Sequence, residues 1–151
     1  LIMVGGNDWS SAERWIEQSD TLKYLKDPAN NLAFEAHVYF DKDASGTYKY
    51  SYEEEECYPE KGIDRVKPFV EWIKQNKFHG FIGEYGIPDN DPRWNETLDL
   101  FLGYLQENGI NGTYWAAGPW WDSYFMAITP KDGKDRPQMP IIEKYTSTFK
   151  K

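Results

Sequence analysis

One glutamate in this sequence has the setting of a catalytic carboxylate. Glu84 follows the short apolar run His79 to Ile82 and lies within Gly83-Glu84-Tyr85-Gly86. The flanking glycines let backbone approach a ligand closely. Hydrolysis of a glycosidic bond uses two carboxyl groups, one as acid and one as nucleophile or base. Glu84 is therefore a candidate for one of these roles, although its position fits equally well a carboxylate that pairs with a basic neighbour.

A histidine and a tyrosine end another apolar run, Leu32 to Phe40. His37 and Tyr39 are two residues apart, so strand alternation places them on one face. Active sites of parallel α/β folds collect at the carboxyl ends of the strands. We therefore expect both side chains at the same rim as Glu84. Taken alone, His37 fits a hydrogen-bonded interior histidine better than a catalytic one.

Tryptophans follow the ends of two other runs. Trp115 lies in the run Gly112 to Ala117, where core packing is the simpler explanation. Trp120 and Trp121 are adjacent in a loop and cannot both enter one core, so at least one is expected to line a groove. Trp9 follows the run Leu1 to Val4 and is a further candidate for a flat binding surface.

The elements that must position these residues form an alternating pattern. Four short apolar runs alternate with helical patterns, which is typical of βαβ units and a parallel sheet. The expected helices span Ser11 to Glu17, where Ser10-Ser11-Ala12-Glu13 has the spacing of a capping box, then Ile63 to Gln75, then Pro92 to a stop at Gly109, and a last one from Pro140.

Four βα units predict an α/β fold, half of a (β/α)8 TIM barrel. A whole barrel takes about 250 residues, and the chain has 151. A four-stranded open α/β sheet is the alternative. The sequence contains no Gly-x-Gly-x-x-Gly or Gly-Lys-Ser/Thr loop, so a nucleotide site has no support.

Charge and composition restrict the partners. The net charge of −8 disfavours nucleic acid, because such binding neutralises phosphates with Lys and Arg. No run approaches the ~20 apolar residues of a membrane span, and no basic run suits an anionic membrane. No His, Asp or Glu cluster has metal-ligand spacing, so we predict no metal and no cofactor. A neutral substrate fits best.

At these residues the sequence resembles glycoside hydrolase family 5, also called cellulase family A. The segment Leu1 to Trp15 is similar to the fifth strand and loop of that family, and Glu35 to Asp41 with Ser45-Gly46-Thr47 is similar to the sixth. Gly83 to Gly86 resembles the seventh strand and Tyr114 to Trp121 the eighth. The ordered set covers essentially the whole chain, so residues 1–151 are interpreted as the C-terminal half of a catalytic barrel.

The resemblance implies a role for each matching residue. It implies that Glu84 is the nucleophile of a retaining endo-β-1,4-glucanase, hydrogen-bonded by Tyr39, with His37 setting the protonation of the site. It further implies that Trp115 lies under the sugar at the point of cleavage, and that Trp9 and Trp120 form subsite platforms. The implied substrate is cellulose or a related β-1,4-glucan, and the implied location is extracellular.

The sequence also departs from the family pattern. The acid/base of the family is the Glu of an Asn-Glu-Pro motif, which is absent here, and the only Asn-Glu is Asn95-Glu96 in an expected helix. We therefore expect the chain to supply the nucleophile half of a site, with an N-terminal half-barrel or a second copy of the chain as partner. The alternative is a non-catalytic half-barrel or a glucan-binding remnant.

Overall fold

The computed structural model describes residues 1–121 and 123–146. Its centre is a parallel sheet of four strands in the order β1-β2-β3-β4, so neighbouring strands in space are also consecutive along the chain. The strands are β1 (Ile2–Gly5), β2 (Leu32–Val38), β3 (His79–Tyr85) and β4 (Asn111–Tyr114). Consecutive parallel strands joined by helices are the repeating unit of a (β/α)8 barrel.

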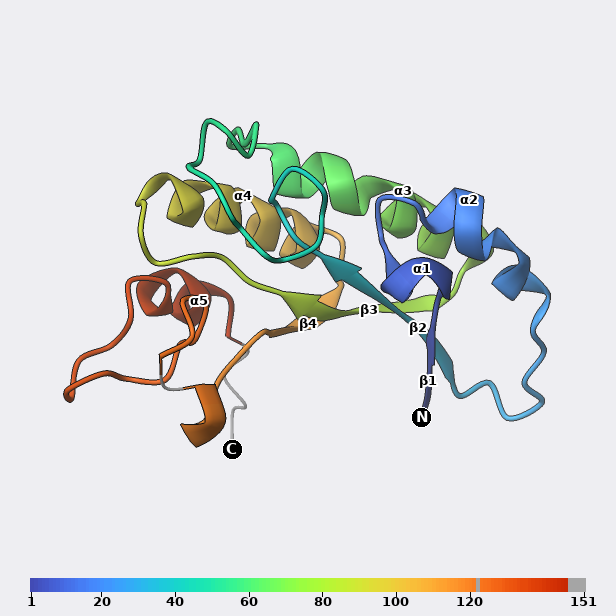
Figure 1. Ribbon diagram of the computed structural model, residues 1–151. Coiled ribbons are helices and arrows are strands. Elements are labelled where there is room, and N and C mark those ends of the chain that lie inside the picture. The colour runs from blue at the N-terminus through green and yellow to red at the C-terminus, as the bar shows by residue number, and fades with distance from the viewer. Residues whose placement is uncertain (122, 147–151) are drawn as a thin grey trace.

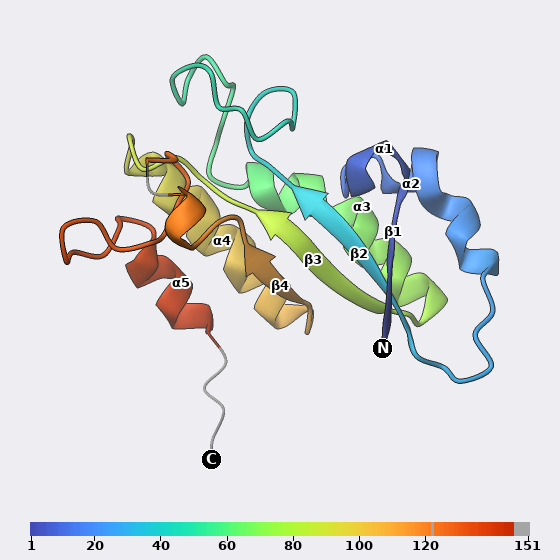
Figure 2. The ribbon, with the colours of Figure 1, turned by 60° about the horizontal axis from the view of Figure 1, so that its bottom comes forward.

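Helices connect the strands. They are α1 (Asn7–Ser10), α2 (Trp15–Ser19), η1 (Asp20–Tyr24), α3 (Lys61–Asn76), α4 (Arg93–Glu107), η2 (Pro119–Trp121) and α5 (Met139–Tyr145). Figures 1 and 2 show α3 and α4 side by side on one face of the sheet, with α5 next to α4. The helices expected near residues 63–75 and 92–109 and after Pro140 are thus confirmed.

The hydrophobic core lies between the sheet and α3 and α4. The ring of Phe34 on β2 packs edge-on against Trp72 of α3, with ring centroids 5.0 Å apart, and Phe40 meets Phe101 of α4 at 5.2 Å. Phe34 is completely buried, and burial of one such side chain stabilises a fold by about 1.5–3 kcal/mol. On β2 the alternate residues Phe34, Ala36 and Val38 are buried and face the helices.

The remaining residues face the other side of the sheet, which in a closed barrel is the interior. On β2 these are Glu35 and His37, which are half-buried while Phe34 and Val38 are buried. Figure 2 shows this face uncovered by any of the described helices. A sheet with helices on one face and polar groups on the other is half of a barrel, as the sequence predicts.

The prediction of a helix from Ser11 to Glu17 is wrong. Ser11 instead forms a bridge with His37 next to the end of β2, and the Ala12 N–H donates to the His37 carbonyl at 3.1 Å. The helix begins only at Trp15, which is completely buried. A tertiary backbone contact thus outweighs the local capping pattern, whose spacing is a weak signal.

Candidate active site

An extra residue in β3 turns the Glu84 side chain toward the face of the sheet that carries His37. Ala36 pairs with Ile82, but the next residue of β2, His37, pairs with Glu84, so Gly83 is a bulge. A bulge turns the following side chain relative to regular alternation and commonly occurs beside active sites. As a result Glu84 points to the same face as His37, where regular alternation from the buried Ile82 would have placed Gly83.

Glu84 contacts both residues that were expected beside it. The phenol of Tyr39 donates a hydrogen bond of 2.9 Å to Glu84 Oε2, and His37 Nδ1 lies 3.6 Å from the same oxygen. Burial, followed by this hydrogen bond, raises the pKa of Tyr39 far above its ordinary value, so Tyr39 remains a donor at any ordinary pH. The Glu84 side chain is 30% exposed and can meet a ligand.

The opposite nitrogen of His37 contacts a second carboxylate. His37 Nε2 lies 2.6 Å from Glu35 Oε1, so the ring stands between Glu35 and Glu84. Burial by itself lowers the pKa of His37, but the hydrogen bond to Glu35 and the charges of Glu35 and Glu84 outweigh burial and raise that pKa above its ordinary value. The arrangement therefore favours a protonated imidazole beside Glu84.

Tyr48 fixes the ends of the two strands that carry these groups. Its hydroxyl accepts from the Phe40 N–H at 2.9 Å and donates to the Gly86 carbonyl at 2.6 Å. Phe40 follows Tyr39 and Gly86 follows Tyr85, so one buried hydroxyl links the chain just after β2 to the chain just after β3. This link preserves the distance between Tyr39 and Glu84.

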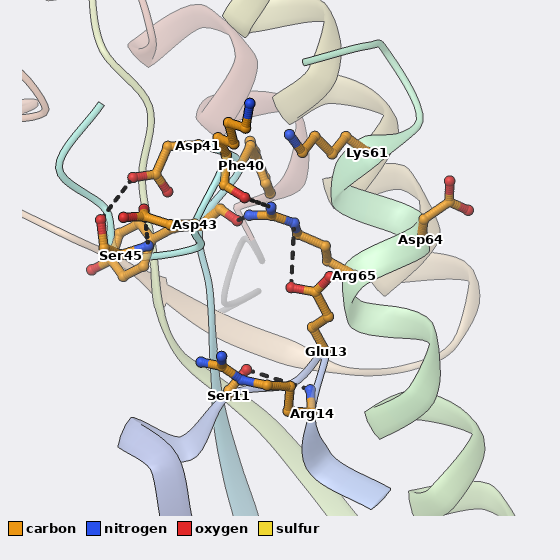
Figure 3. Close-up of polar contacts among 12 residues, drawn as sticks. Ser11, Glu13, Arg14, Phe40, Asp41, Asp43, Ser45, Lys61, Asp64 and Arg65 are labelled. Carbon is orange, nitrogen blue, oxygen red and sulfur yellow. Dashed lines mark hydrogen bonds and ion pairs between the residues drawn. The ribbon is translucent and has the colours of Figure 1, made fainter. Parts of the chain in front are cut away.

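The loop after β2 is held by buried charged groups. The carboxylate of Asp41 is fully buried and accepts from the N–H groups of Gly46, Thr47 and Tyr48 at 3.0–3.2 Å. Arg65 of α3 donates to the backbone carbonyls of Tyr39 and Lys42. Figure 3 shows Arg65 reaching from α3 toward this loop on one side and toward Glu13 on the other.

A hollow of about 410 Å³ opens beside this cluster. It lies between the segment that follows β1 and the loop that follows β2, and its walls include Trp9, Arg14, Asp43, Ser45 and Arg65 with His37, Tyr39 and Glu84. The opening is large enough for part of an oligosaccharide, and the polar side chains in its partly apolar walls suit hydroxyl groups.

Trp9 stands at this hollow on an unusual backbone turn. Asp8, Trp9 and Ser10 all have left-handed φ angles, 54°, 51° and 57°, which cost roughly 1–2 kcal/mol per non-glycine residue. Ser10 Oγ compensates by accepting from the Gly6 N–H at 2.6 Å. The turn presents Trp9 to solvent with 86% of the residue exposed.

The other two tryptophan candidates follow β4 and do not line this hollow. Trp115 is half-buried. Its backbone N–H donates to the backbone carbonyl of Tyr85 at 2.8 Å, and Tyr85 follows Glu84 in the sequence. Its ring meets that of Trp121 with centroids 5.0 Å apart. Trp120 is 90% exposed. The expectation that at least one of the adjacent tryptophans lines a groove stays a prediction.

Three groups escaped the sequence analysis. Glu35 could have been found, because it lies two residues before His37 and alternation puts it on the same face. Tyr48 and Arg65 carried no such signal, since each acts on backbone atoms distant in sequence.

Within residues 1–121 and 123–146, no group of three or more His, Cys, Asp or Glu residues could hold a metal ion. None of the helices described there has the length and apolar character required to cross a bilayer.

The fold and the strand-end cluster define a class of protein. Parallel βα units with a carboxylate, a histidine and a tyrosine at the carboxyl ends of adjacent strands form half of a (β/α)8 enzyme barrel. The family model of the cellulases, glycosyl hydrolase family 5, matches residues 1–120. The chain belongs to this family.

Individual relatives agree with this family. The chain is 38% identical over 149 residues to the protein named probable endo-β-1,4-glucanase B of Aspergillus kawachii, covering 95% of this chain and 43% of that relative. Among solved structures, Pseudomonas stutzeri endoglucanase Cel5A in complex with cellobiose matches with a TM-score of 0.89 and 42% identity, over 98% of this chain and 44% of that one. XacCel5A in complex with cellopentaose matches with a TM-score of 0.86 and 39% identity, over 97% and 48%. The chain thus spans less than half the length of these relatives.

Proposed function

We propose that this chain is the C-terminal half of the catalytic barrel of a retaining endo-β-1,4-glucanase, with Glu84 as nucleophile. The observation that carries the proposal is the hydrogen bond of 2.9 Å from Tyr39 to Glu84 Oε2, made across the ends of β2 and β3. A carboxylate that attacks an anomeric carbon must be ionised and fixed in direction. Tyr39 fixes the direction of the carboxylate by donating to Oε2, and His37 Nδ1 lies 3.6 Å from the same oxygen, where an imidazolium would favour the carboxylate anion.

The substrate is a β-1,4-glucan such as cellulose. The family membership supports this assignment, and so do two relatives that were crystallised with cellobiose and cellopentaose. In this chain Trp115 would stack under the sugar at the point of cleavage, while Trp9 and Trp120 would act as platforms on either side. Flat rings with one exposed face suit the apolar faces of pyranose rings.

The acid/base carboxylate must come from elsewhere. The sequence has no Asn-Glu-Pro motif, and Asn95-Glu96 lies on α4, on the helix side of the sheet. We propose that residues 1–151 act with an N-terminal half-barrel, which would place a glutamate opposite Glu84. In a retaining site the two carboxyl groups would lie about 5–5.5 Å apart. Secretion follows from the same proposal, because an insoluble glucan is met outside the cell.

A test uses an aryl β-cellobioside whose leaving group needs little acid assistance. The chain is assayed alone and after combination with the N-terminal half of a relative's barrel. We expect turnover in the combined form, and Glu84→Gln should reduce it to background. The matched control is Glu96→Gln, an exposed carboxylate on α4 whose loss should leave the rate unchanged. Equal rates for the two variants would contradict the proposal.

The second candidate is a glucan-binding half-barrel without activity, which the missing Asn-Glu-Pro favours. Its signature would be oligosaccharide binding by the chain with no turnover in the combined form.

A further inference from the structure

Glu35 is a carboxylate that the proposed reaction does not use. It lies on β2 two residues before His37, faces the interior side of the sheet, and its side chain is only 18% exposed. In the part of the chain that the structure describes, its ionic contact is with His37 Nε2, at 2.6 Å. A carboxylate in such a position is costly unless it is paired. The contact with His37 is therefore the place to look for the role of Glu35.

The neighbouring strands leave space for this carboxylate. A β-carbon on Gly83 of β3 would lie 1.8 Å from Glu35 Oε1, which no side chain could tolerate without displacing Glu35. A β-carbon on Gly5 of β1 would lie 3.5 Å from Glu35 Oε2, an ordinary van der Waals distance. The space for the carboxylate therefore depends on Gly83, which also forms the bulge that turns Glu84 toward His37.

We propose that Glu35 is a positioning residue: held in the slot that Gly83 leaves open, it orients the His37 ring with Nε2–H toward itself and Nδ1 toward Glu84. The nitrogen of an imidazole that carries the proton is set by the hydrogen bond that the other nitrogen makes. With Nε2–H fixed on Glu35, the second proton of the imidazolium can reside only on Nδ1, 3.6 Å from Glu84 Oε2. Glu35 thus acts through His37 and does not itself touch the substrate.

This role rests on the proposed function but has its own consequence for charge. Glu35 and Glu84 both favour the imidazolium form, so the pKa of His37 is raised in spite of its burial. Other charged groups line the same hollow. They are the Asp8–Arg14 and Glu13–Arg65 pairs, from α1, the segment after it and α3, and Asp43 from the loop after β2. The two pairs combine opposite charges, and the charges that raise the pKa of His37 are those of Glu35 and Glu84.

The test follows His37 by NMR in the 15N-histidine-labelled chain, whose only histidines are His37 and the exposed His79. In the wild type we expect neutral His37 as the Nε2–H tautomer. Glu35→Gln should lower the titration midpoint of His37 without moving that of His79. Gly83→Ala should do the same, because its methyl group would displace the carboxylate. Glu13→Gln, which removes a carboxylate from the same hollow without touching His37, should have little effect.

Several outcomes would overturn the inference. A neutral Nδ1–H tautomer in the wild type would do so without any variant. A His37 titration midpoint that Glu35→Gln leaves unchanged would do so as well. None of these readouts requires turnover, so a catalytically inactive barrel with the expected titration shift would refute the proposed function and leave the role of Glu35 intact.

Discussion

Tyr39 and Glu84 are 45 residues apart in the chain, yet the Tyr39 hydroxyl donates to Glu84 Oε2 at 2.9 Å. The contact joins the residue just after β2 to the penultimate residue of β3. It exists because the strands are parallel neighbours, so their carboxyl ends meet at one rim, and because the Gly83 bulge turns Glu84 toward His37. The relationship is the structural basis for treating Glu84 as the nucleophile.

Loss of this hydrogen bond should slow catalysis. A hydrogen bond to a charged group contributes about 1.5–3 kcal/mol, so Tyr39→Phe should lower kcat/KM of the combined barrel by about 10- to 100-fold. The matched control is Tyr52→Phe, which removes another buried hydroxyl, bonded to Thr97 at 3.1 Å on the helix side. Steady-state kinetics with an aryl cellobioside would compare the two. A larger loss in Tyr52→Phe would argue that the effect is general destabilisation.

The stability of the combined barrel should depend on pH through His37. The pKa of His37 is raised in the folded state because the hydrogen bond to Glu35 and the charges of Glu35 and Glu84 outweigh burial. The stabilisation is therefore complete below the ordinary histidine value of about 6.5 and is lost as the pH rises through the folded pKa. Urea unfolding over pH 5–9 should show this decline in the wild type and a smaller one in His37→Gln. If the free energy of unfolding changed with pH in the same way in the wild type and in His37→Gln, His37 would not contribute to the pH dependence.

Substitutions of the tryptophans should distinguish a role in sugar binding from a role in packing of the fold. Trp115→Ala should weaken cello-oligosaccharide binding to the combined barrel by about 1–3 kcal/mol if the ring stacks on a sugar. It should also lower Tm modestly, since Trp115 contacts Trp121. Trp120→Ala should weaken binding without lowering Tm, because Trp120 is exposed. The control is Tyr24→Ala, which removes an exposed ring on η1 and should change neither the affinity nor Tm. Unchanged affinity with a large fall in Tm would assign Trp115 to the core.

The chain alone should associate. Within residues 1–121 and 123–146, β1 and β4 each pair with a single strand, so two sheet edges are open. Open edges and an uncovered sheet face promote pairing with other chains. Light scattering on the purified chain should detect species larger than a monomer, and an N-terminal half-barrel should convert them to a 1:1 complex. A cooperatively folded monomer at high concentration would contradict this expectation.

The sequence predicted much of the fold because the main signals are local and periodic. The strands and the helices on the core face follow from apolar spacing, and the rim position of His37, Tyr39 and Glu84 follows from strand ends. The bulge at Gly83 was not predictable, because it is defined by pairing with β2. The same holds for the interval between α1 and α2, where Ser11 pairs with His37 and does not begin a helix.

Covalent labelling tests the central assignment most directly. A 2-fluoro-cellobioside with a good leaving group forms a glycosyl-enzyme ester that hydrolyses slowly, so the nucleophile stays labelled. Digestion and mass spectrometry of the combined barrel should locate the label on Glu84, at one label per chain, and Glu84→Gln should remain unlabelled while Glu35→Gln still reacts. A label on Glu35, or on any carboxylate other than Glu84, would show that the nucleophile has been misassigned.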